Sequence, residues 1–224
     1  MFAGHIGASL AIGSAERRVN VGTFVFAALL LDVIFWSFIL LGWESVSIPA
    51  DFADRHQADF VFPYSHGLIA SIAWSVVAAA VLVWCVRLPS GKWRAAALIA
   101  AAVFSHWLLD ALTHQPELPL AGADSAKVGF GLWRNIPIAL VVEAAIVFAG
   151  LAMFLRGSIL SRGRSLALAA LTIVTLAFTV AGMTVAPSPP SAFAMAASSL
   201  ITLIVVCALA WWIGRDTDKL RAHS

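Results

Sequence analysis

The stretch AAALIAAAVFSHWLLDALTH, residues 95–114, has the length and composition of a membrane span and yet carries three ionisable side chains. Before its last two residues it is apolar except for Ser105, His106 and Asp110, and about 20 such residues cross the hydrocarbon core of a bilayer. His106, Asp110 and His114 follow one another at intervals of four residues. Each such step along an α-helix rises about 6 Å and turns about 40°, so the three side chains share one face. Because ionisable groups are costly in lipid unless they serve a site, the stretch predicts a membrane helix that carries chemistry.

The composition places the whole chain in a membrane. Hydrophobic residues make up 61% of its 224 residues and charged residues 12%, and the mean hydropathy of +0.92 is far above that of soluble globular domains. Basic runs with interleaved aromatic residues are missing from the sequence, so no nucleic-acid partner is expected. Cys85 and Cys207 lie far apart in apolar segments, which argues against a disulfide framework or a thiolate metal cluster.

Seven apolar segments of about membrane-spanning length predict the fold. Backbone groups in lipid must be hydrogen-bonded within their own segment, so the segments are expected to be helices. The sequence thus predicts an all-α integral membrane protein, a bundle of about seven transmembrane helices in one domain over residues 1–224. The segments are approximately 1–16, 21–43, 64–86, 94–114, 135–155, 165–186 and 191–213, and the first is the shortest.

The distribution of positive charge predicts the orientation. If the segments alternate in direction, eleven of the fourteen Lys and Arg residues fall on one side and three on the other. The basic side is expected to be cytoplasmic, with the N-terminus outside and the C-terminus inside. The eleven are Arg17, Arg18, Arg87, Lys92, Arg94, Arg156, Arg162, Arg164, Arg215, Lys219 and Arg221, and the three are Arg55, Lys127 and Arg134.

Seven ionisable residues of the spans are all expected in the outer half of the membrane. Helix periodicity does not require this agreement, so it indicates a shared site. A single His or Asp in a membrane helix is also consistent with a role in helix packing alone. His56, in a polar loop, and His223, in the C-terminal tail, are interpreted as solvated. The seven residues are His5, Asp32, His66, His106, Asp110, His114 and Glu143.

This set of ligand types predicts a metal site. Imidazoles and carboxylates without thiolates suit zinc, or iron or manganese, at an open hydrolytic site. A bound divalent metal lowers the pKa of its water to about 7 and polarises a phosphoryl or carbonyl oxygen. More than four ligands leave room for a second metal, and Asp110 is placed to bridge two ions. Glu143, or Asp59 from the loop before the third segment, is the expected general base.

Four sequence blocks resemble the YdjM-like group of membrane-bound, metal-dependent hydrolases. These blocks are LLLDVIFW at 29–36, FPYSHGL at 62–68, HWLLDALTHQPELPL at 106–120 and GFGLWRN at 129–135. The His-x-x-x-Asp-x-x-x-His pattern of the third block is the most specific of them. The resemblance covers most of the chain and implies a metal-dependent hydrolase without indicating a substrate.

The order of the ligand residues is also similar to that of the zinc-dependent phospholipase C and single-strand nuclease superfamily, a helical fold with three zinc ions. That likeness implies that Asp32, His66, His106 and Asp110 form the main site and that His5 binds a neighbouring ion. It would assign His114 and Glu143 to a third ion. The match weakens there, because the soluble enzymes have a longer gap before the equivalent of His114, so the number of ions stays open between one and three.

The resulting functional hypothesis is a metal-dependent hydrolase in the plasma membrane of a bacterium, with its site on the periplasmic side. The expected substrate is a lipid-like molecule that enters sideways from the bilayer and contains a phosphoester or, less favoured, an amide bond. A transporter or proton-relay protein that uses the same row of His and Asp is the alternative. The sequence leaves the substrate, the metal and the oligomeric state open.

Overall fold

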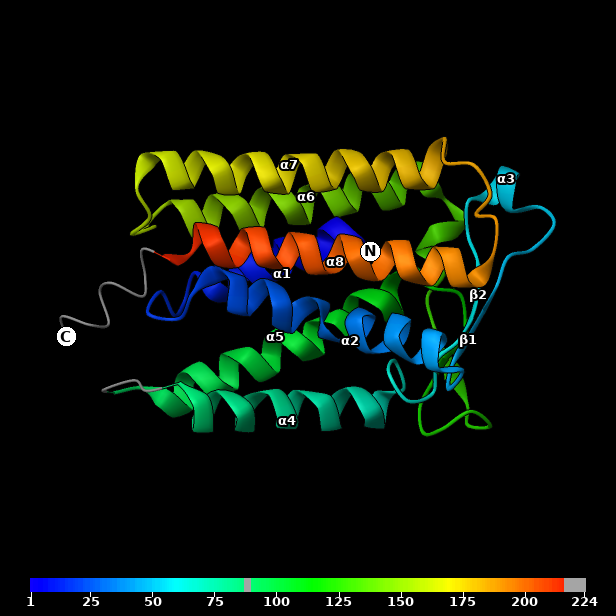
Figure 1. Cartoon of the computed structure of the whole chain (residues 1–224), viewed down its shortest axis with the longest axis horizontal. Helices are drawn as coiled ribbons and strands as arrows, with labels where there is room; N and C mark the ends of the chain where they lie inside the picture. The colour runs from blue at the N-terminus through cyan, green and yellow to red at the C-terminus, as the bar shows by residue number, and fades with distance from the viewer. Residues whose placement is uncertain (87–89, 216–224) are drawn as a thin grey trace.

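Eight α-helices account for most of the chain in the computed structural model, which describes residues 1–86 and 90–215 (Figure 1). Six of them are long and apolar enough to cross a membrane. Their bounds agree with the apolar segments to within a few residues, which confirms the prediction of an all-α bundle of membrane-spanning length. The six are α2 (Val21–Leu41), α4 (Leu68–Cys85), α5 (Lys92–Thr113), α6 (Ile136–Leu155), α7 (Arg162–Thr184) and α8 (Ala192–Ile213).

The first helix, α1 (Phe2–Gly13), is shorter than a membrane span. Its 12 residues extend about 18 Å at 1.5 Å per residue, against about 30 Å of hydrocarbon. Its N-terminus lies within the bundle and its other end lies near the start of α2 (Figure 1). The expected seventh crossing is therefore a half-length helix, and it is enclosed by contacts with α2, α5, α6 and α7.

Two glycine contacts hold α1 and α2 against their neighbours. The backbones of α1 and α6 meet where Gly7 faces Gly150, and a Cβ added at Gly150 would collide with the carbonyl oxygen of Gly7. A Cβ at Gly7 would lie only 2.7 Å from the carbonyl oxygen of Ile146. On α2, Gly22 meets the backbone of Trp211 in α8 in the same way. Small residues let membrane helices approach closely enough for dispersion contacts between backbones.

The loops at one end of the bundle contain short strands that the hydropathy pattern did not predict. β1 (Ser45–Ser47) pairs antiparallel with β2 (Asp59–Val61), and the short helix α3 (Phe52–Arg55) lies between them. β3 (Leu118–Pro119) pairs with β4 (Lys127–Val128) in the loop after α5, before a 3-10 turn at Leu132–Arg134. Strands of two or three residues carry too little periodicity to be recognised in a sequence.

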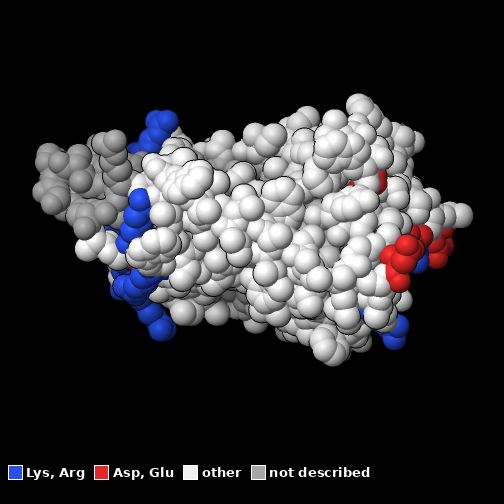
Figure 2. Space-filling view, turned by 90° about the horizontal axis from the view of Figure 1, so that it is seen from below, with Lys and Arg blue, Asp and Glu red and all other residues white. Residues whose placement is uncertain are grey.

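Charged side chains gather at the two ends of the molecule and leave an uncharged band between them (Figure 2). One end carries the described members of the larger basic group, and the other carries Arg55, Lys127 and Arg134 together with the loop carboxylates. Arg87, Lys219 and Arg221, which the sequence assigns to the basic end, lie outside the described residues. The described basic residues of the first end are Arg17, Arg18, Lys92, Arg94, Arg156, Arg162, Arg164 and Arg215.

A buried acid stabilises the loops at the basic end. The guanidinium of Arg18 donates to Glu16 at 2.8 Å and to the carbonyl oxygen of Ser90 at 3.0 Å, and so joins the α1–α2 loop to the loop before α5. The hydrogen bond from Arg18 holds the pKa of Glu16 below its usual value.

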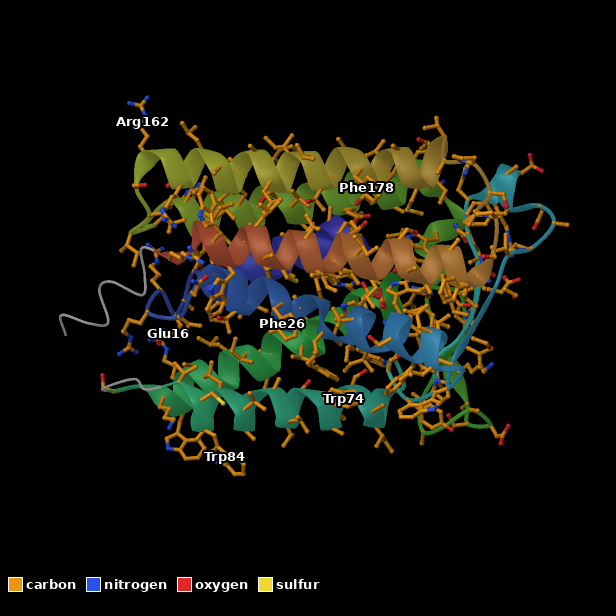
Figure 3. The ribbon with its side chains drawn as sticks, viewed as in Figure 1. Glu16, Phe26, Trp74, Trp84, Arg162 and Phe178 are labelled. Carbon is orange, nitrogen blue, oxygen red and sulfur yellow. The ribbon has the colours of Figure 1, made fainter. Side chains whose placement is uncertain are left out.

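The band between the charged ends exposes large apolar side chains, as a lipid-facing surface does. On α4, Ile69 and Val76 are each 62% exposed. Trp84, at the basic end of this helix, projects away from the bundle (Figure 3) and is 87% exposed. Tryptophan is enriched at the two membrane interfaces, so its place near the end of the apolar band is consistent with a membrane anchor.

Replacement of Gly150 by Ala is expected to displace α1, because the new methyl group collides with the backbone of Gly7. Overpacking of this kind costs about 1–3 kcal/mol. The variant should unfold at a lower temperature in detergent, followed by circular dichroism. Gly163→Ala is the matched control, since a Cβ at this α7 position meets nothing within 4 Å. Equal melting temperatures for both variants would contradict the close approach of α1 and α6.

Candidate metal centre

Five of the predicted site residues converge inside the bundle. They come from three helices and one loop: His5 from α1, Asp32 from α2, His66 from the loop before α4, and His106 with Asp110 from α5. All but Asp32 are almost completely buried, and the side chain of Asp32 is 23% exposed. Residues separated by more than a hundred positions in the sequence thus share one centre.

The backbone of α2 fixes the orientation of His106. The Nδ1 atom of His106 lies 2.6 Å from the carbonyl oxygen of Ala28. A carbonyl oxygen only accepts hydrogen bonds, so Nδ1 carries the proton and donates it. In the neutral ring Nε2 then has a free lone pair, which is the form that binds a metal.

The Nε2 atoms of His66 and His106 face each other at 3.1 Å beside two carboxylates. Asp110 Oδ2 lies 3.1 Å from His106 Nε2 and 3.5 Å from His66 Nε2. Asp32 Oδ1 approaches the same two nitrogens from another side, at 3.7 Å and 3.6 Å. Four electron-rich atoms therefore point at one small volume, which favours a cation there.

His5 lies on the other side of His106 and contacts the second oxygen of Asp110. The two imidazole rings stack with centroids 3.7 Å apart and planes 5° from parallel. His5 Nε2 is 3.2 Å from Asp110 Oδ1, and the amino group of Met1 is 3.6 Å from the same oxygen. His5 Nδ1 is buried and has no hydrogen-bond partner among the described residues. Asp110 thus offers one oxygen to His66 and His106 and the other to His5.

The cluster fits a divalent metal ion. Two groups of three residues each offer ligand atoms within 4.8 Å of one another: His5, Asp32 and His106, and His66, His106 and Asp110. The donors are imidazole nitrogens and carboxylate oxygens, which zinc accepts in open catalytic sites. The two groups share His106, whose Nε2 atom has one lone pair and so binds a single ion.

A cavity of about 330 Å³ adjoins the cluster, and His5, Asp32, His66 and Asp110 are among its lining residues. Phe35 of α2 lines it, as do Phe60 and Phe62 of the aromatic loop, which is the connection of residues 42–67 between α2 and α4. Residues of α7 and α8 also line the cavity, among them Thr179, Ser198 and Met195. Phe178 of α7, another lining residue, is labelled in Figure 3. The buried cluster is therefore accessible to a molecule that fits between the aromatic loop and the helices α7 and α8.

His114 reaches the edge of the cluster by a different route from the one its spacing predicts. Helix α5 ends at Thr113, and His114 has the extended backbone of a helix C-cap. Its Nε2 atom is 3.9 Å from Asp110 Oδ1, and its Nδ1 is 2.5 Å from Glu117 Oε1. His114 also lines the cavity, so it stands beside the candidate metal site as well as next to the space open to a substrate.

The two residues predicted as general bases have other contacts. Glu143 is buried in α6 and accepts the backbone N–H of Gly4 at 2.9 Å, in the first turn of α1. A carboxylate at this position accepts an N–H group that has no partner within the helix, and its negative charge interacts favourably with the helix dipole. Asp59 lies in β2 with its side chain 58% exposed and accepts from Arg55 at 2.6 Å. The structure does not bring Asp59 into the cluster.

Three residues near the site were not selected from the sequence. His56, interpreted there as solvated, is half-buried and lines the cavity, and it has a positive φ of 50°. Glu44 and Ser65 are buried and connect to His66 by hydrogen bonds. No local pattern in the sequence marks Glu44, because its connection to His66 spans 22 positions and depends on the fold.

Comparisons of this chain with models of known protein families, with curated proteins and with solved structures find no match. The resemblances in the sequence therefore stay predictions. The structure does show six helices of membrane-spanning length and apolarity and a buried His/Asp cluster able to hold a metal ion.

We expect the purified protein to retain zinc through dialysis and His106→Ala to lose it, because His106 belongs to both candidate ligand groups. Elemental analysis of protein in detergent measures the metal content. His56→Ala is the matched control, since His56 lines the cavity without belonging to either group. Equal zinc content in His106→Ala and the parent protein would exclude this centre.

Proposed function

We propose that this protein is a membrane-embedded, metal-dependent hydrolase that cleaves a phosphoester bond of a lipid-like substrate. One observation carries the proposal: two buried imidazole nitrogens and two carboxylates converge beside a cavity that is walled by transmembrane helices. Such a site combines metal ligands with access for a molecule that is itself held in the bilayer.

His66, His106, Asp32 and Asp110 would hold the main ion, and His5 would contribute to a neighbouring one. A divalent ion at this site would lower the pKa of a water molecule and polarise a phosphoryl oxygen of the substrate. Asp110 joins the two ligand groups through its two oxygens. Asp32, the most exposed ligand, borders the cavity and would stand next to the bond that is cleaved.

His114 is the residue best placed to move a proton during the reaction. Its Nδ1 atom is bonded to Glu117, which orients the ring, and the residue borders the cavity. A carboxylate that accepts Nδ1–H leaves Nε2 free to accept a proton from an attacking water. The contacts of Asp59 and Glu143 favour His114 over both for this role.

The substrate is proposed to reach the site from the outer leaflet of a bacterial plasma membrane. The positive-inside rule places the basic end in the cytoplasm, and the cavity is lined by the aromatic loop of the opposite end. On α7 and α8, the hydroxyls of Thr179, Ser198 and Thr202 donate to carbonyls of their own helices. Their lone pairs are then available to O–H or N–H groups of a polar lipid headgroup.

A proton or ion pathway across the membrane is less well supported. Such a pathway needs ionisable groups along the whole depth of the bundle. Within the described spans, acidic, basic and imidazole side chains other than the cluster and Glu143 occur only at the basic ends of α5 and α7. Release of product without metal transport into liposomes would separate hydrolysis from transport.

The zinc-loaded protein is expected to hydrolyse a chromogenic phosphodiester, p-nitrophenylphosphorylcholine, and long-chain phosphatidylcholine in mixed micelles. Removal of the metal by a chelator should abolish both activities, and added zinc should restore them. The measurements are nitrophenol absorbance and release of phosphorylcholine. Zinc-loaded protein without activity on any phosphoester lipid tested would contradict the proposed reaction while leaving the metal site intact.

Gly182→Trp tests the entry of lipid between α7 and α8. Gly182 lines the cavity, and a Cβ at this position meets nothing within 4 Å, so a large side chain fills space without a clash. We expect kcat/KM for long-chain lipid to fall about 10-fold, or about 1.4 kcal/mol, with zinc content unchanged. Gly163→Trp, in open space near the other end of α7, should retain the parental rate. Equal rates for both variants would exclude this route.

A further inference from the structure

A buried acid outside the metal cluster is connected to His66 through one serine. Glu44 follows α2 and is 5% exposed. Its Oε1 atom accepts the backbone N–H groups of Tyr64 at 2.8 Å and Ser65 at 2.9 Å, and its Oε2 lies 2.7 Å from Ser65 Oγ. Ser65 Oγ is in turn 2.8 Å from His66 Nδ1.

The number of hydrogens fixes the direction of these bonds. The serine hydroxyl has one hydrogen, and a carboxylate only accepts. Ser65 therefore donates to Glu44, and its oxygen accepts from His66, so His66 Nδ1 carries a proton. The opposite direction would leave two oxygen atoms 2.7 Å apart with no hydrogen between them.

We propose that Glu44 is a positioning residue that acts through Ser65 to fix the tautomer of His66, so that Nε2 presents a free lone pair to the cluster. This inference rests on the proposed metal site and adds to it a side chain that does not touch the ion. Acceptors that hold the second nitrogen of a ligand His set its tautomer and orientation, and their loss costs about 10- to 100-fold in metal affinity.

The two central imidazoles are then held in the same way by different groups. The carbonyl of Ala28 orients His106, and the Glu44–Ser65 pair orients His66. Both nitrogens that face each other at 3.1 Å are thereby left without a proton in the neutral rings. Of the two acceptors, only the side-chain pair can be altered by substitution, which makes the inference testable.

Glu44→Gln keeps the size of the side chain and reverses the direction of the bonds. The two backbone N–H groups require an oxygen, so the amide nitrogen must face Ser65 and donate to it. Ser65 then donates to His66 Nδ1, and the proton of His66 moves to Nε2, toward the cluster. We expect zinc affinity to fall about 10- to 100-fold and ¹⁵N chemical shifts of labelled histidine to report loss of the Nδ1 proton.

Ser65→Ala supplies a second variant in case Glu44→Gln does not fold. It removes the connection to His66 and leaves both backbone N–H bonds of Glu44 in place, so zinc affinity should also fall. Ser75→Ala is the matched control, because this buried serine donates only to Ser71 of its own helix at 2.7 Å. A general loss of packing would lower zinc affinity in the control as well.

The tautomer can be measured in protein without metal, which separates this inference from the proposed function. A parent protein with His66 protonated at Nδ1, and a shift of that proton in Glu44→Gln, supports the role of Glu44 even if zinc does not bind. An unchanged tautomer in Glu44→Gln, or parental zinc affinity in Ser65→Ala, overturns it. Zinc binding by the parent with no effect of either variant would leave the metal site standing and exclude the positioning role.

Discussion

The main constraint on this structure is the free-energy cost of keeping two carboxylates, Asp32 and Asp110, inside an apolar bundle. Charges in a medium of low dielectric are costly unless opposite charge or hydrogen bonds compensate them. The surrounding imidazoles lie 3.1–3.9 Å from the carboxylate oxygens, and the geometry of His106 turns its free lone pair toward the same centre. A bound cation would satisfy both kinds of group at once, which is why the cluster is able to hold a metal ion.

The half-length helix α1 completes the cluster from inside the bundle, because it supplies His5. It places His5 against His106, and its own N-terminal turn is compensated by Glu143 of α6. A full-length helix would carry the chain past the site. The contact between Gly7 and Gly150 sets the depth of α1, since the two backbones touch there. The role of Glu143 follows from this arrangement, because its carboxylate serves the helix that carries His5.

The loops at the acidic end do more than connect helices. The aromatic loop, residues 42–67, places Phe62 beside the cluster, with its ring centroid 5.0 Å from that of His66 and 5.8 Å from that of His114. The start of the same loop supplies Glu44. On α7 and α8 the cavity lining combines hydroxyl groups, such as those of Thr179 and Ser198, with apolar side chains that include Phe178 and Met195. This combination suits a substrate with a polar head and an apolar tail.

The sequence by itself determined the helical bundle, the bounds of the six long helices and the ligand types, because hydropathy over about 20 residues and a four-residue spacing are local properties. His106 and Asp110 were recognisable for that reason. Only the tertiary structure decided that α1 is half-length, that Glu143 compensates a helix end and that Asp59 is surface-exposed. It also revealed that Glu44 is connected to His66 through Ser65. These outcomes depend on which backbone groups and side chains meet across the bundle, and no spacing along the chain encodes such contacts.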